Sequence, residues 1–456
     1  MKRIAGATVL LYCVLIILCA ASAAAHDYSY ALIKLQMLHP DDPGSVTYAL
    51  NSGGIVSGAS YLDSRIRAVL WDGDGRPIHL GTLGGNHSEA RDVNDLDEAV
   101  GWSNFDPENS IWEGHAFLWR SGNLIDLGTL GGRLSEAYAI NDLGQVVGWA
   151  GYDLTGSAAF VWENGQMHEL PSHIRRSGIA YDINNSGQIV GQVVGEVSLE
   201  TAALWENEQL IVLPPLSDRR AAVAPAINDH GHVVGQADFG TKVHAVAWVD
   251  GQVFDLHQPS LGEGSSAWGI NDLNHVVGWV GRRPNSQAFI WTVDQGMRTL
   301  DSLVPSRLRT PTRLNMAHDI NDAGHIAAYG LEQGDPFTLI AYLVNPVTPT
   351  MNLAAPNPGR AGEANTITVT NCTPGATVQF LYSRFGGGQR IPGCDLQQNA
   401  LQLDSPTVIG TAIADGNGVA TITRTVPPIA RNQTILFQAV VQNECAISQL
   451  VVHRFE

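Results

Sequence analysis

The stretch Ala137–Gly148, AYAINDLGQVVG, decides the fold because it recurs along the chain. Close copies are APAINDHGHVVG at Ala224–Gly235 and AWGINDLNHVVG at Ala267–Gly278, and looser copies lie between and around them. We call the first residue of each polar Asn-Asp-x-Gly step the pivot asparagine. The seven pivots are Asn51, Asn94, Asn141, Asn184, Asn228, Asn271 and Asn321, spaced 43, 47, 43, 44, 43 and 50 residues apart. A period of this length predicts a repeat architecture.

Each repeat contains four short apolar runs. In the unit from Asn123 to Gly165 they are Leu124–Leu127, Ala137–Ile140, Val146–Trp149 and Ala159–Trp162. Gly, Asn, Asp and Ser residues bound each run, as they bound short strands. The Asn-Asp-x-Gly step predicts a hairpin turn, because Asn and Asp bond their own backbone and Gly accepts a positive φ. The unit is therefore expected to form four strands.

Seven such units predict an all-β fold, a seven-bladed β-propeller. An open β-solenoid is the alternative architecture. We expect the ring to close on whole units, each opened by a leucine run such as Leu127–Leu130, with no borrowed strand. Aromatic residues at one position of the fourth run are expected to pack between blades; they are Trp71, Trp119, Trp162, Trp205, Trp248 and Trp291, with Tyr342 in the seventh unit.

The repeats resemble the extracellular HAF-repeat family, named for the His-Ala-Phe step that stands here as His115-Ala116-Phe117. Leu127-Gly128-Thr129-Leu130-Gly131-Gly132 and the following Ile-Asn-Asp-x-Gly match that family's pattern, and the resemblance covers roughly residues 30 to 345. It implies a secreted bacterial repeat protein. It implies no activity, because the family is defined by its repeat. The copies at Leu170, Leu213, Leu256 and Leu300 lack the Gly-Thr-Leu-Gly-Gly step, so different loops are expected there.

The first residues predict an export signal at 1–25. Lys2 and Arg3 precede an apolar run, and small residues Ala23-Ala24-Ala25 end it before His26, as in a cleaved signal peptide. A retained anchor and a lipidated Cys19 are the alternatives. The protein is thus expected to be secreted, with the periplasm or cell surface as other destinations. No other stretch is apolar enough for a membrane span in the mature chain.

The sequence changes character after the repeats. We expect the propeller over 26–346, a Pro-rich linker over 347–358 and an immunoglobulin-like β-sandwich over 359–456, acting as a spacer. Cys372, Cys394 and Cys445 lie in this last part. An exported protein is expected to join two of them. All three pairings are open, and Cys394–Cys445 is favoured because Cys394 lies in a Gly/Pro-rich loop and Cys445 follows a strand-like run.

Histidines at one repeat position are the first candidate site. His232, His275 and His325 each follow the Asn-Asp turn, and three converging imidazoles could bind a transition metal. Solvated strand ends are the simpler interpretation. The turn aspartates suggest calcium, but turn chemistry explains them with fewer assumptions; they are Asp95, Asp142, Asp229, Asp272 and Asp322.

A lengthened last unit supplies the second candidate. Its insertion VPSRLRTPTRL carries Arg307, Arg309 and Arg313, which could bind an anionic sugar or form a solvated loop. The formal charge of −18 argues against nucleic acid, which needs a basic footprint. No cofactor-binding or nucleophile motif is present, and a monomer is expected.

Two functions fit these observations. The first is a secreted, non-catalytic module that binds or scaffolds an extracellular glycan or protein. The second is an extracellular polysaccharide hydrolase or lyase with its site at the mouth of the propeller channel. We expect specificity to lie where the repeats differ.

Overall fold

The structure is a computed structural model. It describes residues 29–39, 42–62, 65–106, 113–152, 156–174, 177–194, 200–217, 221–282, 285–304, 313–331, 338–347, 351–372, 375–384, 386–390, 400–403, 406–441, 446–448 and 450–456. The predicted export signal lies outside these residues. The chain divides into two compact units, one over Tyr30–Thr292 and Met297–Pro346, the other comprising Met1–Ser29, Val293–Gly296 and Val347–Glu456.

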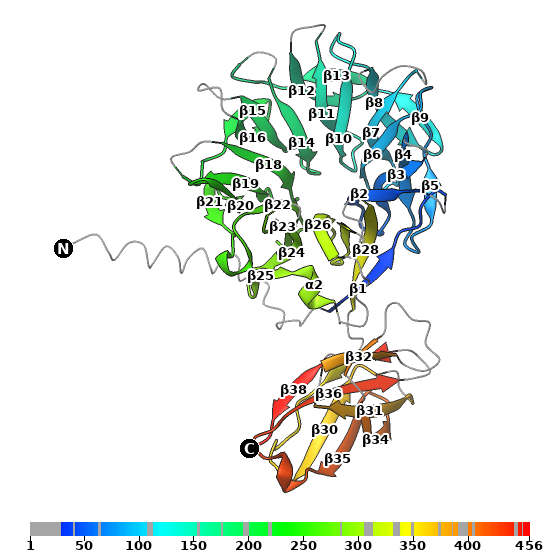
Figure 1. Ribbon diagram of the computed structural model, residues 1–456, viewed down its shortest axis with the longest axis vertical. Helices are drawn as coiled ribbons and strands as arrows, with labels where there is room; N and C mark the ends of the chain where they lie inside the picture. The colour runs from blue at the N-terminus through cyan, green and yellow to red at the C-terminus, as the bar shows by residue number, and fades with distance from the viewer. Residues whose placement is uncertain are drawn as a thin grey trace, which may run out of the picture. The chain divides into compact units, whose positions relative to one another are not determined.

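The first unit is a β-propeller, so the all-β propeller prediction is confirmed. Its described residues form seven four-stranded sheets that succeed one another around an axis (Figure 1). From the axis outward, the first three are β2 (Gly44–Leu50), β3 (Val56–Leu62), β4 (Arg65–Trp71) and β5 (Pro77–His79); β6 (Ser88–Val93), β7 (Ala99–Asn104), β8 (Gly114–Arg120) and β9 (Asn123–Asp126); and β10 (Ser135–Ile140), β11 (Val146–Gly151), β12 (Ser157–Glu163) and β13 (Gln166–Glu169).

The remaining four sheets follow the same order. They are β14 (Ile179–Ile183), β15 (Ile189–Val194), β16 (Glu200–Glu206) and β17 (Gln209–Val212); β18 (Ala222–Ile227), β19 (Val233–Phe239), β20 (Lys242–Val249) and β21 (Gln252–Asp255); β22 (Ser265–Ile270), β23 (Val276–Val280), β24 (Gln287–Thr292) and β25 (Gly296–Thr299); and β26 (Arg313–Ile320), β27 (Ile326–Leu331), β28 (Leu339–Val347) and β1 (Ser29–Lys34). Two short helical turns, η1 (Pro259–Leu261) and α2 (Leu300–Leu303), connect strands of this unit.

The Asn-Asp-x-Gly steps form the predicted hairpin turns between the inner strand and the second strand of each sheet. In the third sheet the Asn141 N–H donates to the Gln145 carbonyl at 3.1 Å, and the Gly144 N–H donates to the Asn141 carbonyl at 3.0 Å. Gly144 adopts a φ of +77°, which a side chain would make costly. The residue types of this step therefore follow from the geometry of the turn.

A bulge in each inner strand explains the glycine that ends the repeated Val-Val-Gly. The pairing of β10 with β11 shifts between Ala137 and Ala139, and the inner strands of the other sheets shift at similar places. This shift brings the Glu136 carbonyl oxygen within 2.0 Å of where a Cβ on Gly148 would stand. Bulges re-aim side chains, and here the bulge turns two consecutive residues toward the axis.

The repeated tryptophans pack between sheets, as predicted. Trp205 is 2% exposed and shares a core with Ala139 and Val147 of the preceding sheet. Its indole N–H donates to the Pro171 carbonyl at 2.7 Å. In the seventh sheet the prediction was wrong. Val344 holds the tryptophan position there, because it pairs with Ile326 as Trp205 pairs with Ile189. Tyr342 lies two residues earlier in the strand.

The expected phase of the repeat was also wrong. The first apolar run of the unit, Leu124–Leu127, instead lies largely in β9, the outer strand of the preceding sheet, which pairs with β8 and not with β10, and the expected opening run Leu127–Leu130 lies in no strand. The ring consequently closes with a borrowed strand, since β1 from the start of the chain completes the sheet of β26, β27 and β28. Apolar runs identify strands, but they do not tell which neighbouring edge each strand joins.

The second unit holds two main sheets around one core. One contains β29 (Asn352–Leu353), β30 (Ala364–Thr370) and β35 (Ala420–Thr425); the other contains β34 (Thr407–Ile413), β31 (Thr377–Ser383), β36 (Thr434–Val441), β37 (Ala446–Ile447) and β38 (Val451–Arg454). Strands β32 (Gly386–Arg390) and β33 (Ala400–Leu403) form a separate pair, and η2 (Pro428–Ala430) is a short turn.

Part of the expected linker belongs to this core. Met351 and Leu353 are 1% and 3% exposed, and β29 pairs with β30, so residues 351–353 do not form the stiff spacer expected over 347–358. Burial of these apolar side chains stabilises their place in the core. No helix in the described part of the chain is long and apolar enough to cross a membrane.

Candidate functional site

A cavity of about 430 Å³ lies on the axis of the propeller. The residues three places before the pivot asparagines line it, because the bulge of each inner strand turns them inward; they are Tyr48, Arg91, Tyr138, Tyr181, Pro225, Trp268 and His318. The residues two places before the pivots also contribute; they are Ala49, Asp92, Ala139, Asp182, Ala226 and Asp319. All seven sheets thus contribute to one cavity, and their side chains three places before the pivots are of five different types.

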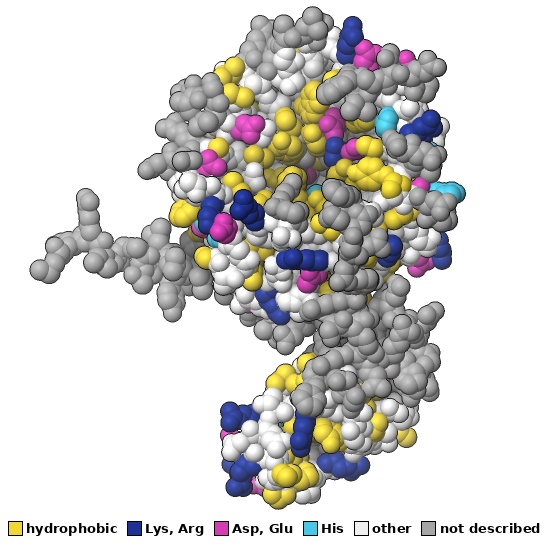
Figure 2. Space-filling view, in the orientation of Figure 1, with side chains coloured by type: hydrophobic (Ala, Val, Ile, Leu, Met, Phe, Trp, Pro, Cys, Tyr) yellow, Lys and Arg dark blue, Asp and Glu magenta, His cyan; other side chains and the backbone are white. Residues whose placement is uncertain are grey.

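Aromatic rings form much of the cavity wall. The rings of Tyr138 and Tyr181 have their centroids 5.3 Å apart, and His318 lies 5.6 Å from Tyr48 and 5.7 Å from Trp268. Trp268 is 37% exposed, an unusual state for a tryptophan in a closed ring of sheets. In Figure 2 hydrophobic side chains gather around the middle of the ring together with acidic and basic ones. The wall therefore offers open aromatic faces.

One guanidinium is built into this wall. Arg91 donates through Nε to Glu136 at 2.8 Å, and its Nη2 lies 3.0 Å from Glu89. Its Cζ lies 4.4 Å from the centroid of the Tyr48 ring and 5.7 Å from that of Tyr138. Two carboxylates thus balance its single charge, and two aromatic faces hold it in place.

Three carboxyl groups form the floor of the cavity. Asp92 accepts the backbone N–H of Val93 and that of Ile140 in the next sheet, both at 2.8 Å. Equivalent bonds run from Ile183 and Ile227 to Asp182, and from Ile320 and Leu50 to Asp319. Each of these aspartates therefore bridges two neighbouring sheets.

Burial perturbs these three carboxyl groups. It raises the pKa of Asp92 to about 7 and that of Asp182 to about 8, and it also raises the pKa of Asp319. Hydrogen bonds from the backbone work in the opposite direction, while the charges of Asp92 and Asp319 add to the rise at Asp182. The side chains face the channel but are surrounded by protein, so desolvation is the largest cause.

The turns close the channel beyond this floor. A second hollow of about 250 Å³ is lined by the pivot asparagines and the turn aspartates, and Asp182 and Asp319 line both hollows. Each pivot asparagine donates through Nδ2 to the carbonyl of the next pivot, at distances from 2.9 to 3.2 Å, and Asn321 donates back to Asn51. The seven bonds form a closed ring.

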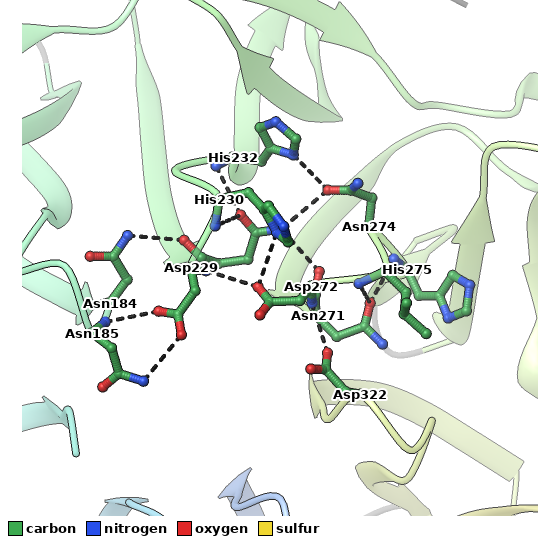
Figure 3. Close-up of polar contacts among 12 residues, drawn as sticks. Asn184, Asn185, Asp229, His230, His232, Asn271, Asp272, Asn274, His275 and Asp322 are labelled. Atoms are coloured by element: carbon green, nitrogen blue, oxygen red, sulfur yellow. Dashed lines mark hydrogen bonds and ion pairs between the residues drawn. The ribbon is translucent and has the colours of Figure 1, made fainter. Parts of the chain in front are cut away.

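The turn aspartates make a second set of links between sheets. The Asp229 N–H donates to the Asp272 carboxylate at 2.9 Å, and the Asp272 N–H donates to Asp322 at 2.8 Å (Figure 3). Six such links run in succession from Ser52 to Asp322. These bonds give the aspartates a structural role, but each carboxylate accepts from the neighbouring turn and not, as turn chemistry had predicted, from the backbone of its own turn.

The three candidate histidines lie at equivalent places, each donating its backbone N–H to its own pivot asparagine. His232 reaches Asn274 of the next turn through Nδ1, at 2.6 Å, and His275 lies apart from it in Figure 3. Burial lowers the pKa of His325. Within the described residues no group of three or more His, Cys, Asp or Glu side chains is placed to hold a metal ion. The structure therefore does not bring these imidazoles together.

Most of the other candidate residues lie outside the described part. Arg307 and Arg309 are among them, and Arg313 is the exposed first residue of β26. Cys394 and Cys445 also lie outside the described residues, so their pairing stays a prediction. Cys372 is buried, with its Sγ 3.6 Å from the Met351 Sδ.

The cavity residues were missed at the sequence level, although a signal was present. Between the alanine and the Ile-Asn that five of the repeats share, the sequence reads Tyr-Ala, Tyr-Asp, Pro-Ala, Trp-Gly and His-Asp. These two positions vary while the residues on either side of them stay nearly the same, which indicates a functional role for the two positions. Only the bulge reveals that both positions face the axis, because regular strand alternation would send one of them away.

Comparisons with known proteins give distant likenesses only. No protein-family model matches the chain, and no curated protein matches it. Among solved structures, TolB from Acinetobacter baumannii is 11% identical with a TM-score of 0.40, covering 59% of this chain; the chain spans 62% of TolB's length. YCF48 bound to a D1 peptide is 12% identical with a TM-score of 0.40, and the match covers 70% of this chain and 96% of the YCF48 chain.

A gluconolactonase from Xanthomonas campestris is similar at the same level. It is 12% identical with a TM-score of 0.33, and the match covers 71% of this chain and 99% of the gluconolactonase. Likenesses this distant carry no information about function. The function has to be argued from the cavity itself.

Proposed function

We propose that the chain is a secreted, non-catalytic binding protein in which a seven-bladed propeller holds a small extracellular ligand, such as the end of a glycan, in its axial cavity. The cavity carries this proposal, because seven similar sheets converge there with side chains of five types, namely tyrosine, arginine, proline, tryptophan and histidine. Ligand sites are concave, largely apolar and furnished with a few placed polar groups. The export signal and the resemblance to the HAF-repeat family support an extracellular setting.

The C-terminal unit completes the proposal. We infer an immunoglobulin-like spacer, because two sheets share one apolar core that includes Ile367, Phe380 and Phe437. A separate core of this kind suits a module that positions the propeller away from a surface. It supplies no part of the described cavity.

Intrinsic fluorescence provides the test. The purified protein would be titrated with neutral oligosaccharides, amino sugars and small amines, with Trp268→Ala as the cavity variant and Phe239→Ala as control. Phe239 is 48% exposed and lies outside the cavity. We expect at least one ligand whose binding Trp268→Ala abolishes and Phe239→Ala preserves. Binding that ignores both substitutions would contradict an axial site.

An extracellular hydrolase or lyase is the second candidate, and one observation favours it. A carboxyl group with a pKa of about 8, as burial gives Asp182, stays protonated at neutral pH and can donate a proton to a leaving group. Release of reducing ends from a polysaccharide, lost in Asp182→Asn and kept in Asp74→Asn, would establish this activity. Asp74 lies in an exposed turn.

A further inference from the structure

We propose that the ligand of the axial cavity carries an organic ammonium group, held between the aromatic wall and the carboxyl floor. This inference rests on the proposed function, since it names the chemical class of the ligand for the same cavity. Two kinds of ligand share this chemistry: amino sugars and small quaternary or primary amines.

The wall has the surface that an organic cation requires. Aromatic faces attract cations through their quadrupole, most strongly where water is excluded. The guanidinium of Arg91 already uses this property, because it lies 4.4 Å from the Tyr48 centroid. Tyr181 and Trp268 present further faces to the same cavity, and the exposed part of Trp268 leaves room for a second cation.

The charge balance of the cavity points the same way. Among the described residues that line the cavity, Arg91 is the one lysine or arginine, and Glu89 and Glu136 neutralise it at 3.0 and 2.7 Å. The floor then adds three carboxyl groups, which in the described part of the chain accept backbone N–H groups and no basic side chain. A cation entering the cavity therefore meets carboxyl groups that lack a basic partner and that it can hold in the ionised form, whereas an anionic sugar meets a guanidinium that is already paired with two carboxylates.

Proton release would accompany such binding. Burial favours the protonated form of Asp92 and Asp182, and a nearby cation favours the ionised form. On binding, a carboxyl O–H bond breaks, the electron pair stays on the carboxylate, and the proton passes to the buffer. The other ionisable groups that face the floor and wall are Asp319, Arg91, Glu89, Glu136, His318 and the three tyrosines.

Matched ligand pairs test the charge directly on the full chain. Choline and 3,3-dimethylbutan-1-ol have one shape and differ by the charge, and glucosamine and glucose differ at one amino group. Calorimetric titration at pH 7 should show at least one cation binding about tenfold more tightly than its neutral partner. The choline and glucosamine arms tell a small amine from an amino sugar. Heats measured in buffers of different ionisation enthalpy should reveal the released protons.

Substitutions test whether the ligand's positive charge interacts with the carboxyl groups of the floor. Asp182→Asn should weaken the preferred cation about tenfold and reduce the proton release, while the exposed control Asp74→Asn changes neither. If Asp182→Asn fails to fold, the ligand pairs on the unaltered protein still decide. Equal affinity within each pair overturns the inference. Binding of glucose but of neither cation would overturn it and leave the proposed function standing, whereas no Trp268-dependent binding of any ligand would remove both.

Discussion

The pivot asparagines do the same work at seven places, and their side chains explain why this residue recurs. The Asn228 Oδ1 accepts the N–H groups of His230 and His232, and its Nδ2 donates to the Asn271 carbonyl. Serine could accept within the turn, but it could not also span to the next sheet. One amide therefore satisfies the turn and joins neighbouring sheets at the same time.

Removing one of these amides should lower stability more than an ordinary surface change. Asn228→Ala removes the acceptor of two partly buried N–H groups and a donor to the Asn271 carbonyl, so we expect the free energy of unfolding to fall by about 2–4 kcal/mol. Asn228→Asp keeps the acceptor and should cost less. Urea denaturation measures both. Asn123→Ala, at an exposed position, is the control, and an equal loss there would disprove the ring's contribution.

The buried aspartates should make stability depend on pH. Their carboxyl pKa values are about 7 and 8 in the folded protein, against an ordinary value near 4 in the unfolded chain. The folded state therefore binds more protons between about pH 4 and pH 8. This stabilisation is complete below about pH 4 and is lost as the pH rises through the folded pKa values.

Asp182→Asn should flatten this dependence. Each such carboxyl contributes at most about 1.4 kcal/mol per pH unit within the window. The measurement is the difference between wild type and Asp182→Asn in the free energy of unfolding at pH 5 and at pH 8, because that difference cancels other titrating groups. A wild-type protein that gains stability relative to the variant toward pH 8 would reverse the assigned sign.

At the scale of elements, the strands and turns followed from the sequence and their pairing did not. The runs of the third repeat match β9 to β12 within two residues at each end, because apolar residues and turn residues are local signals. The partner of each run depends on which free edge is nearest after the chain turns. That choice lies outside any single repeat, so the phase was assigned one strand too early.

The cavity illustrates the same limit. Turn residues were found because Asn, Asp and Gly have specific backbone preferences. Arg91 and Trp268 stand in stretches that read as ordinary strands, and their inward direction depends on a bulge that the Gly101 and Gly278 positions permit. The candidate histidines were noticed because they recur, yet the site is formed by residues that do not.

Closure by β1 yields a prediction for this element. Tyr30, Ala31 and Leu35 are each at most 1% exposed, and burying a large apolar side chain contributes about 1.5–3 kcal/mol. A chain that begins at Gln36 should therefore lose more than about 3 kcal/mol in urea denaturation and should aggregate through the open edge of β28. A synthetic peptide of residues 29–35 should restore stability, and a scrambled peptide should not. Restoration by both peptides would argue against a specific strand.

At the scale of the whole molecule, each unit has a core of its own. The cluster that contains Met351, Phe380 and Phe455 draws its residues from the C-terminal unit alone. The clusters of the propeller each join two neighbouring sheets, and the one around Trp71 joins the first sheet to the seventh. Hydrophobic clusters therefore join neighbouring sheets from the seventh through the first to the sixth, which favours unfolding of the ring as one cooperative unit.

Separate cores predict two transitions in calorimetry of the full chain. A chain ending at Pro346 should keep the propeller transition and the cavity affinity, with a change in stability below about 0.5 kcal/mol, as holds for sites that do not interact. The substitution Phe380→Ala should lower the melting temperature of the C-terminal transition only, because the void it leaves lies in the C-terminal core. Trp205→Ala should lower the melting temperature of the propeller transition only. A single transition that responds to both substitutions would show that the two units unfold together, and the C-terminal unit would then stabilise the ring that holds the cavity.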